Sequence, residues 1–227
     1  MTDAISDLEV LYTDSHLLAV NKPAGVPVQA DLTGNPALLD IAKAWLKKEY
    51  NKPGNVYLGL LHRLDRPVAG VVLFARTSKA AARLSKQFRE RVPKKIYRVV
   101  VQGYPNPGKG ELTHYLRKEK TRKATVFTRE TEGAKQADLL YEVIEHLDNS
   151  SVLEVTLKTG RFHQIRAQLA FVGHPVLGDK KYGAAKTLPQ KQIALYASSL
   201  TVRHPINKKE MAFTSPPPEG WPFANPI

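Results

Sequence analysis

The sequence has no cysteine among its 227 residues, and its acidic residues are few beside its basic ones. Without thiols, a disulfide scaffold, thiolate chemistry and a cysteine-ligated metal or iron–sulfur site are excluded. Long apolar runs are also lacking, because the longest, Ile193–Val202, covers about ten residues and a bilayer span needs roughly 20. Residues 1–9 carry three acids and no apolar core, so we expect no signal peptide. These absences predict a cytoplasmic, soluble protein.

What is present is enough apolar material for a core, together with a strong excess of positive charge. Hydrophobic residues make up 42%, while 34 Lys and Arg face 21 Asp and Glu, which gives a formal net charge of +13. The apolar share excludes a disordered polycation. The length fits one domain, or one domain with two lobes. The charge suggests a polyanionic partner, most simply nucleic acid.

Periodicity and turn residues predict an α+β fold with a mixed, mostly antiparallel β-sheet core and flanking helices. Helices are expected after Asn35-Pro36, over 77–91 with Thr77 as its cap, and over 162–172. The last helix has an apolar stripe formed by Phe162, Ile165, Leu169 and Val172. We expect strands at 8–13, 17–20, 70–75, 96–102, 112–116, 124–128, 139–144, 152–157, 194–198 and 200–203. The chain, 1–227, is interpreted as a single domain with a folded core at about 8–205 and a proline-rich tail at 215–227.

The motifs that mark a nucleotide-dependent or zinc-dependent enzyme are missing. The sequence has no Walker A segment, no G-x-G-x-x-G after a strand, no G-x-S-x-G and no H-E-x-x-H. Its seven histidines are dispersed, which argues against a metal site built from histidine alone. We therefore expect no metal and no organic cofactor.

Two dense polar segments stand beside strongly apolar ones. The first is H-R-L-D-R-P-V-A-G at 62–70, and the second is T-G-R-F-H-Q-I-R at 159–166. Charged groups next to buried segments are costly unless they are paired, so the Asp of the first segment and an Arg of the second could satisfy each other. From spacing alone, a structural ion pair is the plainer explanation.

Three further segments belong with these two. K-I-Y at 95–97 lies between them, and G-H-P-V-L-G-D-K-K-Y-G at 173–183 and L-Y-A-S-S-L-T-V-R-H-P at 195–205 lie after them. Together, the five segments resemble the RluA-type pseudouridine synthase family, whose patterns include H-R-L-D-x-x-x-x-G and L-x-T-G-R-x-H-Q-I-R. The chain departs from the family at Val68-Ala69, where Thr-Ser is frequent, and at Gln168, where a His is common. The resemblance outweighs the purely structural interpretation of the Asp–Arg pair.

The resemblance implies an enzyme that isomerises uridine in RNA to pseudouridine. The N-glycosidic bond breaks, the uracil rotates and a carbon–carbon glycosidic bond forms, with no cofactor required. Asp65 is implied as the catalytic carboxylate, either as a nucleophile at the sugar or as a base that leads to a glycal. Arg166 is expected to hold Asp65 ionised and oriented, and Tyr97 to pack on the target base.

The same resemblance implies further substrate contacts, because the enzyme must first extrude the target base from its stack. Arg63 would fill the vacated space, and His62 would assist the rearrangement. Ile165 and Leu195 would form apolar walls around the base. The alternative for His62 is that it is simply a buried, hydrogen-bonded histidine. The alternative for Ile165 and Leu195 is plain core packing.

Two stretches are dense in positive charge. Residues 76–98 hold nine basic residues and one acid, and residues 117–123 hold five and one. Such patches neutralise phosphates, although a solvated helix face explains the first stretch equally well. The expected partner is an rRNA or tRNA stem-loop, bound without an N-terminal S4-type domain and without a membrane. The second stretch supplies the candidate RNA contacts Arg117, Lys118, Lys120, Arg122 and Lys123.

Two rival functions remain at this point. A non-catalytic RNA-binding or RNA-chaperone protein on the same scaffold would use the basic stretches equally well. It would not need Asp65, Tyr97 and Arg166. A hydrolase that uses Asp65 and a histidine has no motif to support it.

Overall fold

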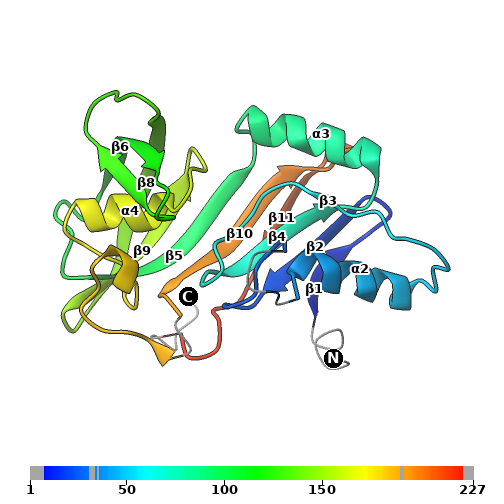
Figure 1. Ribbon diagram of the computed structural model, residues 1–227, viewed down its shortest axis with the longest axis horizontal. Coiled ribbons are helices and arrows are strands. Elements are labelled where there is room, and N and C mark those ends of the chain that lie inside the picture. The colour runs from blue at the N-terminus through cyan, green and yellow to red at the C-terminus, as the bar shows by residue number, and fades with distance from the viewer. Residues whose placement is uncertain (1–7, 31–33, 35, 190–191, 222–227) are drawn as a thin grey trace. The chain divides into compact units, whose positions relative to one another are not determined.

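The computed structural model describes residues 8–30, 34, 36–189 and 192–221, and it has the α+β composition that the sequence predicts (Figure 1). The described chain divides into two compact units, Met1–Pro93 with Ala197–Pro218 and Lys94–Tyr196 with Glu219–Ile227. None of the helices in these described ranges is long and apolar enough to cross a membrane. The helices are α2 (Leu38–Glu49), α3 (Ser78–Arg89), α4 (Gln164–Phe171) and the short 3-10 helix η1 (Lys180–Tyr182).

The first unit is a β-sheet with two helices. Its strands are β1 (Glu9–Thr13), β2 (Leu17–Lys22), β3 (Gly59–Leu60), β4 (Ala69–Ala75), most of β10 (Leu195–Arg203) and β11 (Glu210–Thr214). Within the described residues of this unit, β1 pairs with β2, β2 with β4, β3 with β4 and β10 with β11, and all four pairs are antiparallel. All seven residues of β4 are buried, as its β-branched, glycine-bounded sequence predicts.

Helix α3 covers the core of this unit. The Thr77 side chain accepts a hydrogen bond from the Ala80 N–H at 3.1 Å, which confirms the predicted cap. Leu84 is fully buried in the core with strand residues of β2 and β4, and Phe88, one turn later, packs against the same cluster. The predicted inner face of the helix is therefore correct.

The second unit is an antiparallel sheet with strand order β5-β9-β8-β6-β7, packed against α4 (Figure 1). Its strands include long pairs, such as eight register partners between β5 and β9. The expected antiparallel meander is correct except at β7. In a meander β7 would lie between β6 and β8, whereas here β6 pairs directly with β8 and β7 lies at the edge of the sheet. The bounds are β5 (Lys94–Gln102), β6 (Lys109–Lys118), β7 (Ala124–Phe127), β8 (Lys135–Leu147) and β9 (Ser150–Leu157).

Side-chain alternation places Tyr97 on the face of this sheet that α4 covers. Ala167 of α4 shares a cluster with Ala137 of β8, and Leu139 lies on the same face two residues later. Leu139 pairs with Leu157 of β9, and Leu157 pairs with Lys95 of β5, which lies two residues before Tyr97. Tyr97 and α4 therefore belong to one face of the second unit.

Four details differ from the sequence-based expectation. The two strands expected at 194–198 and 200–203 are one strand, β10, because Ser199 between them pairs with Thr214 of β11 instead of forming a turn. Strand β11 lies beyond the expected end of the core and places Phe213 in the core of the first unit. Val172 and Phe171 are exposed, so the apolar stripe of α4 ends at Leu169. The expected helix start at Asn35 lies outside the described residues, and α2 itself begins at Leu38.

Candidate active site

Asp65 lies in the loop that leads into the most buried strand of the first unit. Its side chain is half-buried, whereas Leu64 and Val68 on either side are buried. The Asp65 carbonyl accepts a hydrogen bond from the Val68 N–H at 3.0 Å, which closes a tight turn. Because the loop is anchored by apolar side chains, the Asp65 carboxylate is held at the margin of the core. The apolar Val68-Ala69 pair packs into this core.

Gly70, the glycine of the H-R-L-D-x-x-x-x-G segment, has a structural explanation. Its φ angle is +114°, which L side chains rarely adopt. A Cβ atom at this position would lie 2.2 Å from the carbonyl oxygen of Ala197 in β10. Only glycine allows β4 to approach β10 this closely, immediately after the Asp65 loop.

His62 is anchored to the sheet. Its Nε2 accepts a hydrogen bond from the Leu73 N–H of β4 at 3.0 Å, and its ring stacks on Phe88 with centroids 5.1 Å apart. This hydrogen bond continues the pairing of β4 with the very short strand β3. His62 thus fixes the start of the loop, while Arg63, the next residue, is exposed.

Lys22 is a charged residue beside this loop that the sequence analysis did not single out. It ends β2, its side chain is fully buried, and its Nζ donates hydrogen bonds to three backbone carbonyls. Burial lowers the pKa of the Lys22 ammonium to about 7, while the charge of Asp65 acts to raise it and that of Arg66 to lower it. The available signal was a lysine followed by Pro23 at the end of an apolar strand.

The second unit contains the other predicted catalytic residues. Tyr97 is buried in β5, and Arg166 is buried on α4. Arg166 makes a two-pronged ion pair, with Nε 2.6 Å from Oδ2 and Nη2 2.9 Å from Oδ1 of Asp179. Both side chains are almost fully buried, so the guanidinium plane is fixed within the unit. Asp179 was missed as a partner, although it lies in the G-H-P-V-L-G-D segment.

The predicted apolar walls also lie in the second unit. Ile165 on α4 and Leu195 at the start of β10 are both buried. Gln168, where the family often has a histidine, is fully buried on the same helix. Its Nε2 donates to the carbonyls of Leu112 and Ala137, which joins α4 to β6 and β8. This departure from the family pattern therefore has a packing role.

His163 precedes α4 in the left-handed conformation, with φ of +53°. The Tyr182 hydroxyl accepts a hydrogen bond from the Ala124 N–H at 2.7 Å and lies 2.9 Å from His163 Nδ1. Burial, followed by the charges of Arg166 and Lys181, lowers the pKa of His163 to about 3. His163 is neutral at physiological pH.

The basic hairpin, residues 117–123 at the end of β6 and in the turn to β7, is held against aromatic rings. Lys118 lies 4.9 Å from the Phe162 ring centroid, and Lys123 lies 5.3 Å from that of Tyr182. Arg117 pairs with Glu119 at 2.9 Å. The remaining two predicted contacts, Lys120 and Arg122, are exposed at the tip.

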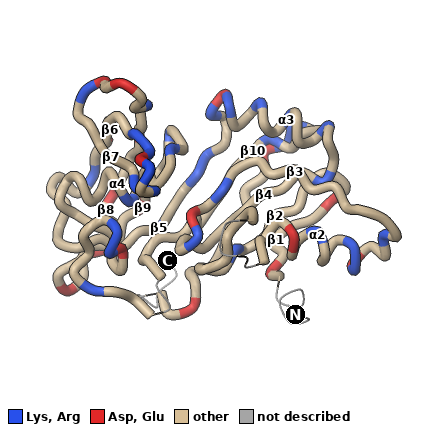
Figure 2. The backbone as a smooth tube through the Cα atoms, viewed as in Figure 1, with Lys and Arg blue, Asp and Glu red and all other residues tan. Residues whose placement is uncertain are grey.

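Helix α3 carries part of the other basic stretch, and Figure 2 shows Lys and Arg along it. Arg83 donates to the carbonyl of Pro205 at 2.9 Å, and Lys86 lies 3.8 Å from Glu90. Arg83 and Lys86 therefore have structural partners.

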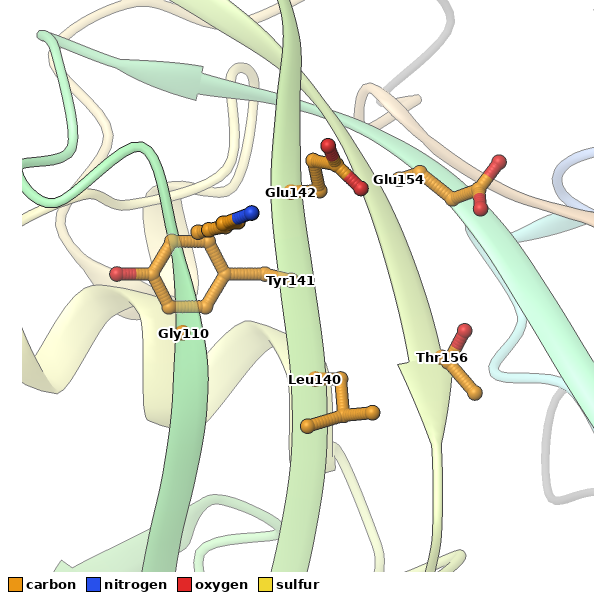
Figure 3. Close-up of a pocket in the computed structure, with 7 residues that line it drawn as sticks. Gly110, Leu140, Tyr141, Glu142, Glu154 and Thr156 are labelled. Atoms are coloured by element: carbon orange, nitrogen blue, oxygen red, sulfur yellow. The ribbon is translucent and has the colours of Figure 1, made fainter.

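A shallow hollow of about 350 Å³ lies on the opposite face of the second sheet (Figure 3). It is lined by Leu140, Glu142, Glu154 and Thr156 among others, and Tyr97 is on the other face because it pairs with Val155. Glu142 and Glu154 are register partners, so two carboxylates stand side by side. Lys109 also lines the hollow, and Arg98 lies 3.0 Å from the Glu154 carboxylate, so the two acidic side chains stand beside basic ones. The hollow contains none of the predicted site residues.

Comparison with known proteins gives one consistent result. Residues 16–171 match the family model described as RNA pseudouridylate synthase. The dual-specificity RNA pseudouridine synthase RluA of Pasteurella multocida is 35% identical over 217 residues, which cover 92% of this chain and 93% of the relative. The ribosomal large subunit pseudouridine synthase D of Zymomonas mobilis is 32% identical, covering 93% of this chain and 70% of the relative.

Solved structures agree with the fold. Human RNA pseudouridylate synthase domain containing 4 has a TM-score of 0.78 at 24% identity, and the match covers 94% of this chain and 90% of that one. Human RNA pseudouridylate synthase domain containing 1 has a TM-score of 0.72 at 25% identity, with coverage of 93% and 84%.

Proposed function

Because the chain belongs to the RNA pseudouridylate synthase family and is an RNA pseudouridine synthase, we propose that Asp65 is its catalytic carboxylate. The observation that carries the proposal is the loop itself. The half-buried carboxylate stands on a tight turn between buried Leu64 and Val68. The turn leads into β4, which can lie this close to the backbone of β10 only because residue 70 is glycine. A turn anchored in this way restricts the orientation of the carboxylate. Nucleophilic or general-base attack at a sugar requires such a restricted orientation.

Tyr97 and Arg166 complete the proposed catalytic set. Tyr97 would stack on the target base, and Arg166 would keep the carboxylate ionised, as the family resemblance implies. Support for Arg166 is its fixed guanidinium, held along one edge by Asp179. Asp65 belongs to the first unit and the other two residues to the second, so we also propose that the two units function as one catalytic domain.

The proposed substrate is a stem-loop of tRNA or rRNA in the cytoplasm. Unpaired loops are the accessible targets in folded RNA, and one matched relative is named for the large ribosomal subunit. We propose that Arg63 and His62 support extrusion of the base, that Ile165 and Leu195 border it, and that the basic hairpin binds phosphates. The exposed Lys120 and Arg122 are the members of that hairpin best suited to this role.

The test is to compare wild type with Asp65→Asn, which removes the carboxylate charge and preserves its size. We expect Asp65→Asn to lose pseudouridine formation on total cellular RNA, by at least about 1,000-fold in turnover, while RNA affinity is retained. Asp40→Asn, an exposed carboxylate in α2, is the matched control and should be fully active. Mapping of pseudouridines in a deletion strain, rescued with wild type or Asp65→Asn, identifies the RNA. Turnover by Asp65→Asn equal to that of wild type would refute the proposal.

A further inference from the structure

Phe162 is an aromatic residue that the proposed catalytic set does not include. It occupies the x of the G-R-x-H pattern, so the family resemblance assigns it no role. Its ring is half-buried and packs against the cluster that contains Leu116 and Ala167. The ring is also stacked on that of His163, with centroids 3.8 Å apart and planes inclined by 19°. His163 therefore covers one face of the Phe162 ring.

The opposite face of the ring is covered by a side chain that can leave it. Lys118 Nζ lies over the Phe162 ring at 4.9 Å from the centroid, and rings stacked at 3.8 Å leave no room for an ammonium between them. Lys118 is exposed, and among the residues that the structure describes it takes part in no ion pair. An exposed cation–π contact contributes only about two- to fivefold to an equilibrium. Lys118 is thus a weakly held cover on an aromatic face.

Ring contacts link Phe162 to the proposed catalytic set within the second unit. The His163 ring meets the Tyr182 ring edge-on, with centroids 5.6 Å apart, and the Arg166 guanidinium carbon lies 5.2 Å from the Tyr182 centroid. Two aromatic rings therefore separate Phe162 from the guanidinium proposed to act on Asp65. RNA bound beside Arg166 would pass its neighbouring nucleotides close to Phe162.

Phe127 of β7 offers a matched comparison in the same hairpin. The Arg117 guanidinium carbon lies 4.9 Å from the Phe127 centroid, so this ring also carries a cation. Arg117, however, pairs with Glu119 at 2.9 Å and donates to the Glu132 carbonyl at 3.4 Å. Its guanidinium is held in place, and the Glu119 carboxylate beside it would repel a phosphate. Phe127 therefore lacks the replaceable cover that Phe162 has.

We propose that Phe162 is a stacking platform for an unpaired nucleobase that flanks the target uridine, and that Lys118 moves from the ring to the phosphate of that nucleotide. The proposal rests on the phosphate-binding role proposed for the basic hairpin. Stacking of a base on an aromatic ring contributes about fivefold to 150-fold in affinity, more than the cation–π contact that it replaces. Lys123 over Tyr182 and the bond from Lys181 to the Arg122 carbonyl still hold the hairpin.

The platform does not read sequence, because every base has a π face. The test therefore uses two RNA decamers, one of cytidines and one with the same ribose-phosphate backbone and no bases. Cytidine cannot be converted to pseudouridine, so binding of its decamer does not depend on the role proposed for Asp65. The two decamers share their phosphates, so the ratio of their Kd values isolates the contribution of the bases. Fluorescence anisotropy at low salt measures both Kd values.

Phe162→Leu keeps an apolar side chain against the cluster and removes the flat ring. We expect it to weaken binding of the cytidine decamer about tenfold and to change binding of the abasic decamer by less than about twofold. Phe162→Trp keeps a flat ring and should bind the cytidine decamer within about threefold of wild type. Phe127→Leu is the matched control and should leave both Kd values within about twofold of wild type.

Two further readouts separate stacking from a structural role. Lys118→Met removes an exposed charge and should lower the slope of log affinity against log salt concentration by about 0.7 for both decamers, whereas Phe162→Leu should keep the slope of wild type. On total cellular RNA, Phe162→Leu should raise KM about tenfold and leave kcat unchanged, as loss of a binding contact away from the reacting atoms does.

The outcomes are distinct from those of the proposed function. An equal loss for both decamers in Phe162→Leu, or no loss for either, would overturn the stacking proposal, and so would an equal loss in Phe127→Leu. Should Phe162→Leu not fold, Lys118→Met decides, and an unchanged salt slope would contradict the proposal. An active Asp65→Asn would refute the catalytic role alone. If Lys120→Ala/Arg122→Ala binds the abasic decamer as wild type does, the phosphate-binding role of the hairpin tip fails, while the ratio of the two decamers still judges stacking.

Discussion

The protonation state of His163 follows from its burial and from the charges around it. Burial disfavours the imidazolium form, and so do the neighbouring cations Arg166, Lys181 and Lys118, against one opposing carboxylate, Asp179. The Nδ1 atom of the ring lies 2.9 Å from the Tyr182 hydroxyl, which accepts a hydrogen bond from the Ala124 N–H.

This state makes stability depend on pH. The pKa of His163 is about 3 in the folded protein and near 6.5 when unfolded, so the unfolded chain binds more protons between these values. Stability contributed by neutral His163 is complete above pH 6.5 and is lost as pH falls toward 3. From pH 7 to pH 5 the loss should approach about 2 kcal/mol. Urea unfolding of wild type and His163→Asn at both pH values measures it.

Asparagine is the suitable replacement because it tolerates the left-handed conformation and does not titrate. The other histidines contribute equally in both proteins, so the difference between the two pH dependences isolates His163. An identical pH dependence in wild type and His163→Asn would show that the histidine is not held neutral.

Sequence patterns singled out the residues that we propose as catalytic, and missed the residues that contact them. Asp65 and Arg166 stand in dense motifs that are visible in one dimension. Asp179 binds Arg166 from a loop 13 residues away, and Lys22 binds a carbonyl 44 residues away. Such partners are set by tertiary contacts, and a carbonyl acceptor has no sequence signature. Lys22 is visible in the sequence as a lysine before Pro23 at the end of an apolar strand, but that local pattern does not show that the side chain is buried.

At the scale of elements, the basic hairpin divides into an anchored base and an exposed tip. Lys118 and Lys123 pack over aromatic rings, and Lys181 Nζ donates to the Arg122 carbonyl at 2.8 Å. The turn is therefore tied to η1 and to the start of α4, within one unit. A fixed tip that carries Lys120 and Arg122 presents two charges without ordering a flexible loop on binding, which lowers the entropic cost.

The double variant Lys120→Ala/Arg122→Ala should weaken RNA binding mainly at low salt. Each phosphate contact contributes a slope of about 0.7–0.9 in the dependence of log affinity on log salt concentration. We expect the slope to decrease by about 1.5 while kcat at saturating RNA stays near that of wild type. Filter binding from 50 to 300 mM salt measures the slope.

The matched control is Lys47→Ala/Lys48→Ala at the end of α2, which removes the same charge from an exposed helix. If both double variants lower the slope equally, the effect reflects total charge and the hairpin has no special role. A slope unchanged in Lys120→Ala/Arg122→Ala would exclude the tip from the RNA contacts.

At the scale of the molecule, strands with a buried face were predictable and the end of the fold was not. Strand β4 has a continuous apolar run, and α3 has a cap, an inner face and a stop, so local patterns define them. Strand β11 is a short edge strand that alternates between exposed and buried residues, close to a proline-rich segment. Its pairing with β10 depends on the path by which the chain returns to the sheet. Local sequence patterns hold no information about that path.

Strand β11 should nevertheless be essential to the first unit. It pairs with five residues of β10, and Phe213 is buried in the same cluster as Leu84 and Val71. Beyond it, the Ser215 hydroxyl donates to Asn21 at 2.8 Å, next to Lys22 at the end of β2. Loss of a buried Phe side chain alone costs about 3–5 kcal/mol, which is a large part of a typical total stability of about 5–15 kcal/mol.

We therefore expect a chain ended after Pro205 to lose at least about 10 °C in Tm, or to remain unfolded, because core and strand partners disappear together. A chain ended after Pro218 keeps β11 and the Ser215 bond, so it should unfold within about 3 °C of the full chain. Thermal unfolding followed by circular dichroism compares the two. Equal Tm values for both shortened chains would mean that β11 is dispensable and that the core ends where the sequence pattern predicts.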